Sequence, residues 1–172
     1  YWAVQLGEGY SSGAVSNPIL VNGELVVYAK DKIYRIDKDT GATIKTGTMA
    51  GTSDFAINGP TYADGMLLVG LSNGRVQAFD ADSLDSLWVS ESLGDSITCP
   101  IVSTDGKLYT GTSKAFVCLT TSDDDTSQST EPKNTQWKNE AAGGFDGVGA
   151  YVSSDCVVFG SEQGVLYSVN PE

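Results

Sequence analysis

The sequence contains one pattern four times, at intervals close to 43 residues. Each copy passes through a short polar turn into an apolar run and then reaches a second apolar run. The copies begin at Pro18, Pro60, Pro100 and Gly149. A further position of the pattern is held by Trp2, Lys45, Trp88 and Trp137, which are 43, 43 and 49 residues apart. Tandem copies of this kind stack side by side, because a single unit cannot bury its apolar surface alone.

The turns inside the copies predict β-hairpins. Three copies place Asn-Gly or Asp-Gly between apolar runs, and these dipeptides favour the type I′ turn of a two-residue hairpin. They are Asn22-Gly23, Asp64-Gly65 and Asp105-Gly106. In the second copy, strands are expected at about 56–63, 66–71, 75–80 and 85–90. Four strands of about five residues and their turns come to roughly 40–45 residues. Each repeat is therefore expected to form one four-stranded antiparallel blade of an all-β propeller.

We predict a single β-propeller domain over residues 1–172, with strands A to D in each blade. The blades are expected at about 13–47, 56–90, 98–139 and 147–169 plus 1–6. The chain opens on a D-type strand and stops after a C-type strand, so the first strand would complete a last blade. Two architectures fit: a closed four-blade ring, or part of a seven- or eight-bladed ring. The second requires self-association through a propeller edge, or the remainder of a longer chain.

The stretch from Asp64 to Trp88 carries the most specific pattern, Asp-Gly-x-Leu-x-Val-Gly followed by Gly-x-Val-x-Ala-x-Asp-Ala and a tryptophan. This pattern resembles the pyrroloquinoline-quinone (PQQ)-type propeller repeat, and the resemblance covers essentially the whole chain. In that family the repeat glycine lets neighbouring blades approach, and the tryptophan fills the gap between them. The resemblance thus implies structural roles for Gly70, Gly111, Gly160, Trp2, Trp88 and Trp137. It also favours the seven- or eight-bladed ring.

Two parts of the sequence depart from the repeat. Lys45 stands at a tryptophan position, so the outer strand of the first repeat is expected to pack less tightly. Residues 120–132 replace the Asp and Thr-Gly of the third repeat with a polar, acidic segment. A segment of this composition is predicted to be an exposed loop between strands C and D.

Composition excludes several classes of function. The net charge of −12, with only ten Lys and Arg, argues against nucleic acid. The sequence contains no run of eighteen apolar residues, so membrane insertion is not expected. There is no histidine to act as the base of a Ser or Cys nucleophile, and most carboxylates fall in expected turns. Cys99, Cys118 and Cys156 lack metal-site spacing and are expected to be buried free thiols. We predict no enzyme, no metal and no cofactor.

The resemblance also supplies an alternative, a fragment of a PQQ- and calcium-dependent dehydrogenase. In those members the cofactor lies on the axis of an eight-bladed ring, beside calcium and an adjacent-cysteine disulfide. This chain has no Cys-Cys pair and only four blades. Oxygen ligands for calcium occur at Asp37 and Asp39 and at residues 123–125, but neither group completes an EF-hand loop. A hairpin turn and a solvated loop are the simpler interpretations.

The remaining candidate surface is formed by the D–A and B–C loops. An acidic residue beside an aromatic one recurs there, and such pairs hold sugars, peptides or cations. The predicted ligand-binding residues are Tyr10, Asp54, Phe55, Asp95, Phe145 and Asp146. In a second interpretation these aromatics cap the hydrophobic interior. We predict a non-catalytic binding or scaffold module of an exported bacterial protein, extracellular or at the cell surface, with a protein or carbohydrate partner.

Overall fold

A computed structural model of the chain describes residues 1–6, 15–53, 58–122, 132–140, 144–145 and 149–172. These residues contain β-strands and no helix, so none of them forms a helical membrane span. The strands are β1 (Ile19–Val21), β2 (Glu24–Ile36), β3 (Thr43–Ser53), β4 (Thr61–Ala63), β5 (Met66–Gly70), β6 (Val76–Asp80), β7 (Ser86–Val89), β8 (Val102–Thr104), β9 (Lys107–Gly111), β10 (Phe116–Thr120), β11 (Trp137–Asn139), β12 (Ala150–Val152), β13 (Val157–Gly160) and β14 (Leu166–Val169).

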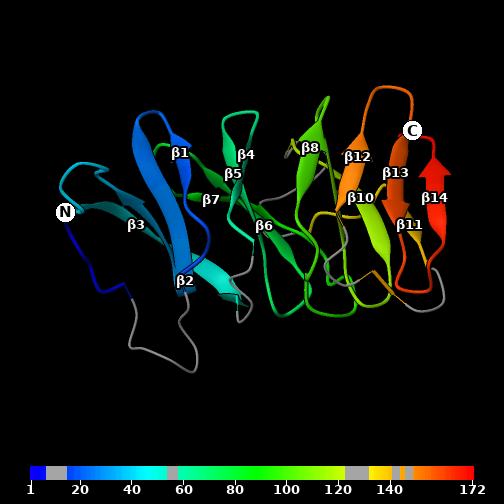
Figure 1. Cartoon of the computed structure of the whole chain (residues 1–172), viewed down its shortest axis with the longest axis horizontal. Helices are drawn as coiled ribbons and strands as arrows, with labels where there is room; N and C mark the ends of the chain where they lie inside the picture. Colours follow the sequence, from blue (N-terminus) through cyan, green and yellow to red (C-terminus); the bar gives the residue numbers. More distant parts are fainter. Residues whose placement is uncertain (7–14, 54–57, 123–131, 141–143, 146–148) are drawn as a thin grey trace.

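The strands form four antiparallel sheets, one for each sequence repeat. The sheets contain β1–β3, β4–β7, β8–β11 and β12–β14, and consecutive strands pair within each. Figure 1 shows the sheets side by side in sequence order. The A–B hairpins turn where the sequence predicts. Asn22, Asp64 and Asp105 have φ of 51°, 53° and 51°, and the glycine after each is also at positive φ, as a type I′ turn requires. The all-β propeller prediction is confirmed.

The first sheet has the same layout as the others, although β2 runs unbroken for 13 residues. Arg35 Nη2 lies 2.6 Å from Glu24 Oε2, at the opposite end of β2. In a straight strand these residues would be about 36 Å apart, so β2 must fold back on itself. Lys30, at φ 58°, lies near the middle of β2. The two halves of β2 therefore serve as strands B and C of the first blade.

Each pair of neighbouring blades encloses its own hydrophobic core, because alternate side chains of a strand point to opposite faces. Blades 1 and 2 bury Val26, Tyr28, Ile33, Leu67, Val69 and Phe79. Blades 2 and 3 bury Leu68, Val76, Ala78, Leu108, Val117 and Leu119. Blades 3 and 4 bury Tyr109, Phe116, Cys118, Val157 and Phe159. The same repeat positions recur at all three interfaces, so each blade depends on its neighbour for burial of its apolar residues.

Tryptophans join blade 2 to blade 3 and blade 3 to blade 4. Trp88 is 3% exposed and its Nε1 donates to the carbonyl of Thr121, 2.8 Å away in the following blade. Trp137 Nε1 donates to the carbonyl of Pro171 at 3.4 Å. The ammonium of the buried Lys133 lies over the indole of Trp88, 4.8 Å from the ring centroid, in a cation–π contact. These contacts agree with the structural role that the resemblance implies for the tryptophans.

Lys45 breaks this pattern as its sequence position predicts. The first four residues of β3, including Lys45, are exposed. In place of an indole, the C–D turn of blade 2 comes close to the backbone of blade 1. A Cβ added to Gly47 would lie 2.8 Å from the carbonyl oxygen of Leu84, which itself has φ of 56°. Close backbone approach thus replaces aromatic packing at this interface.

The four blades form an open arc. Within the described residues, no strand of β12–β14 pairs with a strand of β1–β3, and Figure 1 places the two termini at opposite ends of the row. Residues 1–6 do not pair with the last blade. They lie against the first blade, where Trp2 Nε1 donates to the carbonyl of Lys38 at 3.0 Å and the Tyr34 hydroxyl donates to that of Leu6. Of the two predicted architectures, the structure has the open one.

Replacing Trp88 should destabilise the whole arc. We expect Trp88→Ala to lower the free energy of unfolding by about 3–5 kcal/mol, as for other buried aromatics. Trp88→Phe should cost less, because it loses the hydrogen bond to Thr121 but keeps apolar contact. Urea denaturation followed by circular dichroism measures both variants. Tyr62→Ala, at a side chain 47% exposed, is the control and should change stability by less than about 0.5 kcal/mol. Equal effects of Trp88→Ala and Tyr62→Ala would contradict the assignment.

Candidate functional site

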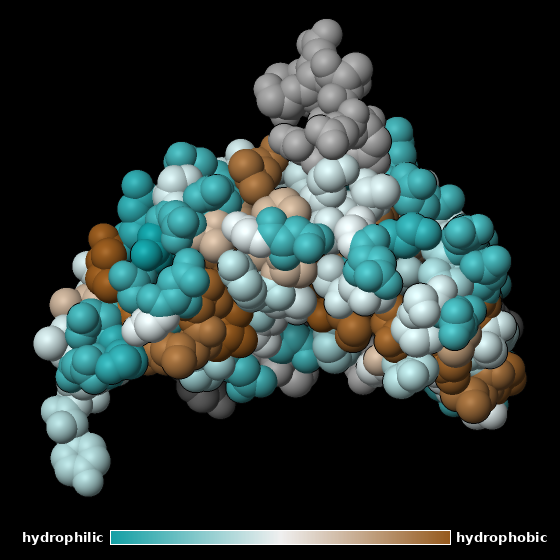
Figure 2. Space-filling model, turned by 90° about the horizontal axis from the view of Figure 1, so that it is seen from above, coloured by the Kyte–Doolittle hydropathy of each residue, from teal (hydrophilic) through white to brown (hydrophobic). Residues whose placement is uncertain are grey.

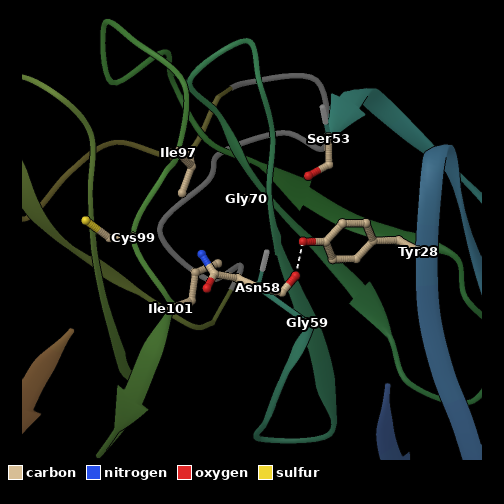
Figure 3. Close-up of a pocket in the computed structure, with 8 residues that line it drawn as sticks. All are labelled: Tyr28, Ser53, Asn58, Gly59, Gly70, Ile97, Cys99 and Ile101. Carbon is tan, nitrogen blue, oxygen red and sulfur yellow. Dashed lines mark hydrogen bonds between the residues drawn. The ribbon is translucent and has the colours of Figure 1, made fainter. Parts of the chain in front are cut away.

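A small pocket lies where the first three blades meet, beside the D–A connections. We call it the interblade pocket, and Figure 3 shows its lining side chains. They are Tyr28, Ser53, Asn58, Gly59, Gly70, Ile97, Cys99 and Ile101. The cavity volume is about 10 Å³, which is the space that one water molecule needs. The pocket as it stands is therefore too small for a cofactor or a sugar.

The polar groups of the interblade pocket hold the blades together. The Tyr28 hydroxyl donates to the carbonyl of Asn58, and burial raises the pKa of Tyr28, so the phenol stays protonated as a donor. The Asn58 amide in turn donates to the carbonyl of Thr98 at 3.3 Å. The side chains of Tyr28 and Asn58 and the backbone carbonyl of Thr98 thereby link three consecutive blades.

The repeat glycines Gly70 and Gly111 lie at these blade contacts. A Cβ added to Gly70 would be 2.5 Å from Ile97 Cγ2, and one added to Gly111 would be 2.9 Å from Cys99 Sγ. Real side chains do not approach that closely, so only glycine fits without displacement. Gly160 ends β13 at the corresponding place and pairs with Leu166. The packing role implied for the glycines agrees with the geometry at Gly70 and Gly111.

Asp95 is the predicted binding residue that the structure leaves open to solvent. Its carboxylate accepts hydrogen bonds from the Ser113 hydroxyl and from the backbone N–H of Ser96. These two bonds, with the nearby Lys114 ammonium, lower the pKa of Asp95. The carboxylate is therefore ionised at neutral pH and held in a fixed orientation on the D–A loop between blades 2 and 3, against the B–C loop of blade 3.

Phe145 lies beneath the same loop and is fully buried. Its backbone N–H donates to the carbonyl of Thr112 at 3.2 Å, and its ring packs edge-on against Phe116 and Phe159. The structure thus places this aromatic in the core between blades 3 and 4, where it caps the interior and does not reach solvent. The other predicted residues, Tyr10, Asp54, Phe55 and Asp146, lie outside the described part of the chain.

Hydrogen bonds between blades tie the loops of this surface together. We define the loop face by its exposed described residues Asn73, Ser92, Asp95 and Lys114. Asn73 Nδ2 donates to the carbonyl of Ala50 in blade 1 at 3.1 Å. The Ser96 hydroxyl donates to the carbonyl of Ser72 at 2.7 Å, and Asp95 accepts from Ser113. Strand β3 of blade 1 and the loops of blades 2 and 3 are therefore held in one fixed polar surface.

The sequence did not single out Ser113 or Lys114 as part of this surface. Both lie in the hairpin between strands B and C of the third repeat. The corresponding hairpin of the second repeat holds Asn73. The Ser-Asn-Gly sequence there indicates a turn of the backbone but says nothing about the role of the Asn73 side chain. Comparing the B–C hairpin positions across repeats would have identified these residues together.

The calcium candidate at Asp37 and Asp39 is organised as a turn. Asp37 Oδ1 accepts from the backbone N–H groups of Asp39 and Thr40 and from the Thr40 hydroxyl. The hydroxyl and N–H of Thr40 are the main cause of the lowered pKa of Asp37. The Asp39 carboxylate pairs with Lys38. Residues 123–125, the other candidate, lie outside the described residues.

The three cysteines are free. Cys99 and Cys118 are buried, and Cys156 is partly buried. Burial raises the pKa of the Cys118 thiol to about 11, so it is protonated and unreactive at neutral pH. Its position in the core between blades 3 and 4 agrees with a packing role.

Comparison with known proteins identifies the family. The model of the family described as outer membrane protein assembly factor BamB matches residues 1–126. The chain belongs to this PQQ-repeat family. No curated protein matches the sequence.

Three solved structures show this similarity. The computationally designed Ika4 protein has a TM-score of 0.69 and 16% identity, covering 96% of this chain and 95% of its own. BamB from Moraxella catarrhalis has a TM-score of 0.67 and 16% identity, covering 93% of this chain and 46% of its own. Quinohemoprotein alcohol dehydrogenase from Comamonas testosteroni has a TM-score of 0.58 and 21% identity, over 76% and 22%. The chain thus spans about half the length of that BamB.

The geometry at Gly70 predicts a steric defect that can be relieved. We expect Gly70→Ala to cost about 1–3 kcal/mol of stability, because the new methyl group overlaps Ile97. Gly70→Ala should cost less in an Ile97→Ala background than in the wild type, because the smaller side chain leaves room for the new methyl group. Gly149→Ala is the matched control, since its Cβ would meet nothing within 4 Å. Thermal melts of the wild type, the three single variants and the double variant test the prediction, and a neutral Gly70→Ala would show that the blades do not need this close approach.

Proposed function

We propose that this chain is a non-catalytic binding or scaffold module whose partner is another protein, held on the loop face. The observation that carries the proposal is the set of hydrogen bonds from one blade to the next that fixes Asn73, Ser96 and Asp95. A surface that is already ordered loses little conformational entropy when it binds. Polar loops on a rigid scaffold are where binding residues concentrate.

Two further features favour a protein over a small ligand. The interblade pocket has room for about one water, whereas sites for small molecules measure about 300–1,000 Å³. The exposed groups Asn73, Asp95 and Lys114 belong to loops of two different blades, a spread that suits a broad partner. The family description names an outer membrane protein assembly factor. It supports proposing a protein partner and an exported, bacterial location for this chain.

Site-specific photocrosslinking tests the loop face. A benzophenone side chain at Lys114, in the B–C loop of blade 3, should form one defined adduct with a partner protein in cells that produce this chain. The same group at Asp105, in the A–B turn at the other end of blade 3, should form none. Asp95→Ala should weaken the Lys114 adduct severalfold, because it removes an ionised group beside the crosslinker. Adducts of equal strength at Lys114 and Asp105 would contradict the proposal.

The alternative is that this chain is a fragment of a quinone-dependent dehydrogenase. The similarity in fold to such an enzyme is the reason to consider it. The donor set for its calcium does not fit. In the described ranges, no three His, Cys, Asp or Glu side chains come together as metal ligands, and the Asp37 carboxylate is occupied by its own turn. The sequence also has no adjacent cysteine pair.

Thermal melting with PQQ and calcium separates the two functions. A ligand at 100 times its Kd adds about 2.7 kcal/mol to the stability of the folded state. For a chain of this size that gain would raise Tm by roughly 5–10 °C. We expect a change below about 1 °C with PQQ and calcium together, matching the change with calcium alone. A rise of several degrees that requires both would overturn the binding-module proposal in favour of the dehydrogenase.

A further inference from the structure

A segment of the third repeat lies along the outer edge of blade 2. The carbonyl of Lys133 accepts from the N–H of Glu91 at 2.8 Å, and the N–H of Lys133 donates to the carbonyl of Val89 at 3.0 Å. The two backbones run parallel, with Lys133 opposite Ser90. Thr135 extends the contact, because its N–H and its hydroxyl both donate to the Glu91 carboxylate at 3.0 Å. The outer edge of a blade in this protein therefore accepts a further strand.

The side chains of that segment match the edge that it covers. Lys133 is fully buried, and its ammonium lies over the indole of Trp88. An indole face attracts a cation, and the ammonium also donates to the Thr120 hydroxyl at 2.9 Å. The edge of blade 2 offers an indole and a carboxylate, and the strand on it brings a lysine and a threonine that complement them.

The outer edge of blade 1 is longer and lacks such a strand in the described chain. β3 has 11 residues, against four in β7 and three in β11. Among the described residues it pairs only with β2, and no isolated bridge lies on its outer side. Its last residues contact blade 2, where the N–H of Ser72 donates to the carbonyl of Thr52 at 2.8 Å. The outer edge is therefore open from Thr43 to Thr48.

The repeat shows which backbone groups this edge presents. Thr46 stands 43 residues before Val89, at the same repeat position. Thr48 stands at the repeat position of Glu91. In blade 2 the N–H of Ser90 bonds to strand C, and the residues on either side of it point outward, because successive residues of a strand direct their polar groups to opposite sides. The carbonyl of Thr46 and the N–H of Thr48 therefore face away from the sheet of blade 1.

The basic residues of the chain are concentrated beside this edge. Residues 30–48 contain five of the ten Lys and Arg and only three acidic residues, in a chain of net charge −12. Arg35 and Lys38 are paired with nearby carboxylates. Lys45 is exposed and forms no ion pair within the part of the chain that the structure describes. Figure 2 shows hydrophilic surface over much of the left end of the molecule, where Figure 1 places blade 1. Lysine on an edge discourages pairing with a like strand, so this edge favours an acidic one.

We infer that an extended acidic segment of a partner protein adds to the edge of β3 as a further strand, parallel to it. The carbonyl of Thr46 and the N–H of Thr48 pair with its backbone, as the edge of blade 2 pairs with Lys133. A glutamate or aspartate of the segment lies beside Lys45, at the place where Lys133 lies over Trp88. The charge that the edge selects is thus the reverse of the charge selected at blade 2.

This edge is separate from the loop face. The loop face belongs to the B–C and D–A loops, whereas the open part of β3 follows the C–D turn of blade 1. In strand addition, backbone hydrogen bonds supply affinity and the side chains supply selectivity. The inference therefore goes beyond the proposed function, and either one can fail without the other.

Two labelled peptides test the charge preference, one alternating valine with glutamate and the other alternating valine with lysine. Fluorescence anisotropy at physiological salt should show tighter binding of the glutamate peptide, although the net charge of −12 by itself favours the lysine peptide. Lys45→Glu should weaken binding of the glutamate peptide about tenfold, because attraction becomes repulsion. Lys114→Glu makes the same charge change on the loop face and should leave binding unaltered. Equal weakening by both variants, or no binding of the glutamate peptide to the wild type, would exclude this edge as the site.

The Thr48 amide tests whether the glutamate peptide adds as a strand. In the wild type, hydrogen exchange of this amide should slow when the peptide binds. Thr48→Pro removes the outward N–H, which an edge strand tolerates, and should abolish binding. Thr48→Val keeps the N–H, loses the same hydroxyl and should bind like the wild type, with circular dichroism to check that both variants are folded. Unchanged exchange at Thr48 with the peptide bound, or binding by folded Thr48→Pro at wild-type affinity, would overturn the added strand.

Discussion

The contact on which the arc depends is the one between the tryptophan of one blade and the backbone carbonyl of the next. A buried indole needs a partner for its N–H, and the carbonyls of Thr121 and Pro171 supply it to Trp88 and Trp137. At Lys38, the third acceptor, the carbonyl is positioned by the C–D turn, which the Asp37 carboxylate holds through three hydrogen bonds. At Lys38 the repeat aspartate and the tryptophan are thus two halves of one joint, whereas Thr120 and Asn170 take the place of the aspartate before the other two acceptors. Asp37 therefore has a structural explanation.

The same joint explains how far the sequence predicts the fold. Spacing of the Asn-Gly and Asp-Gly turns was enough for the hairpins, because residues at positive φ are costly elsewhere. The tryptophan spacing was enough for the blade period, including the weak position at Lys45. The repeats by themselves left the open arc and the closed ring both possible, because both ends carry the same apolar positions as the interior, and only the family resemblance favoured the open one. Whether those positions are covered depends on what meets them and not on the local sequence.

The candidate site was predicted less well, for a related reason. The acidic-aromatic pairs drew attention to Phe145, but its ring is enclosed by Phe116 and Phe159. The sequence does not distinguish an aromatic residue beside a turn that caps a core from one that faces solvent. Asp95 was predicted because it lies in a D–A loop, while Ser113 and Lys114, which lie beside it in the structure, were not. Ser113 lies 18 residues from Asp95 in the sequence, yet its hydroxyl donates a hydrogen bond to the Asp95 carboxylate. Only the packing of blade 3 brings the two side chains together.

Acidic and apolar side chains lie on different parts of each blade. The acidic side chains of the A–B and C–D turns, such as Asp64, Asp82 and Asp155, lie at the rim of the blades and carry much of the net charge of −12. The apolar side chains at the two ends of the arc lie on the flat sides of the blades. These acidic groups therefore lie away from the flat sides, and the repulsion between them, which is screened beyond about 8 Å at physiological salt, does not oppose the packing of one blade on the next.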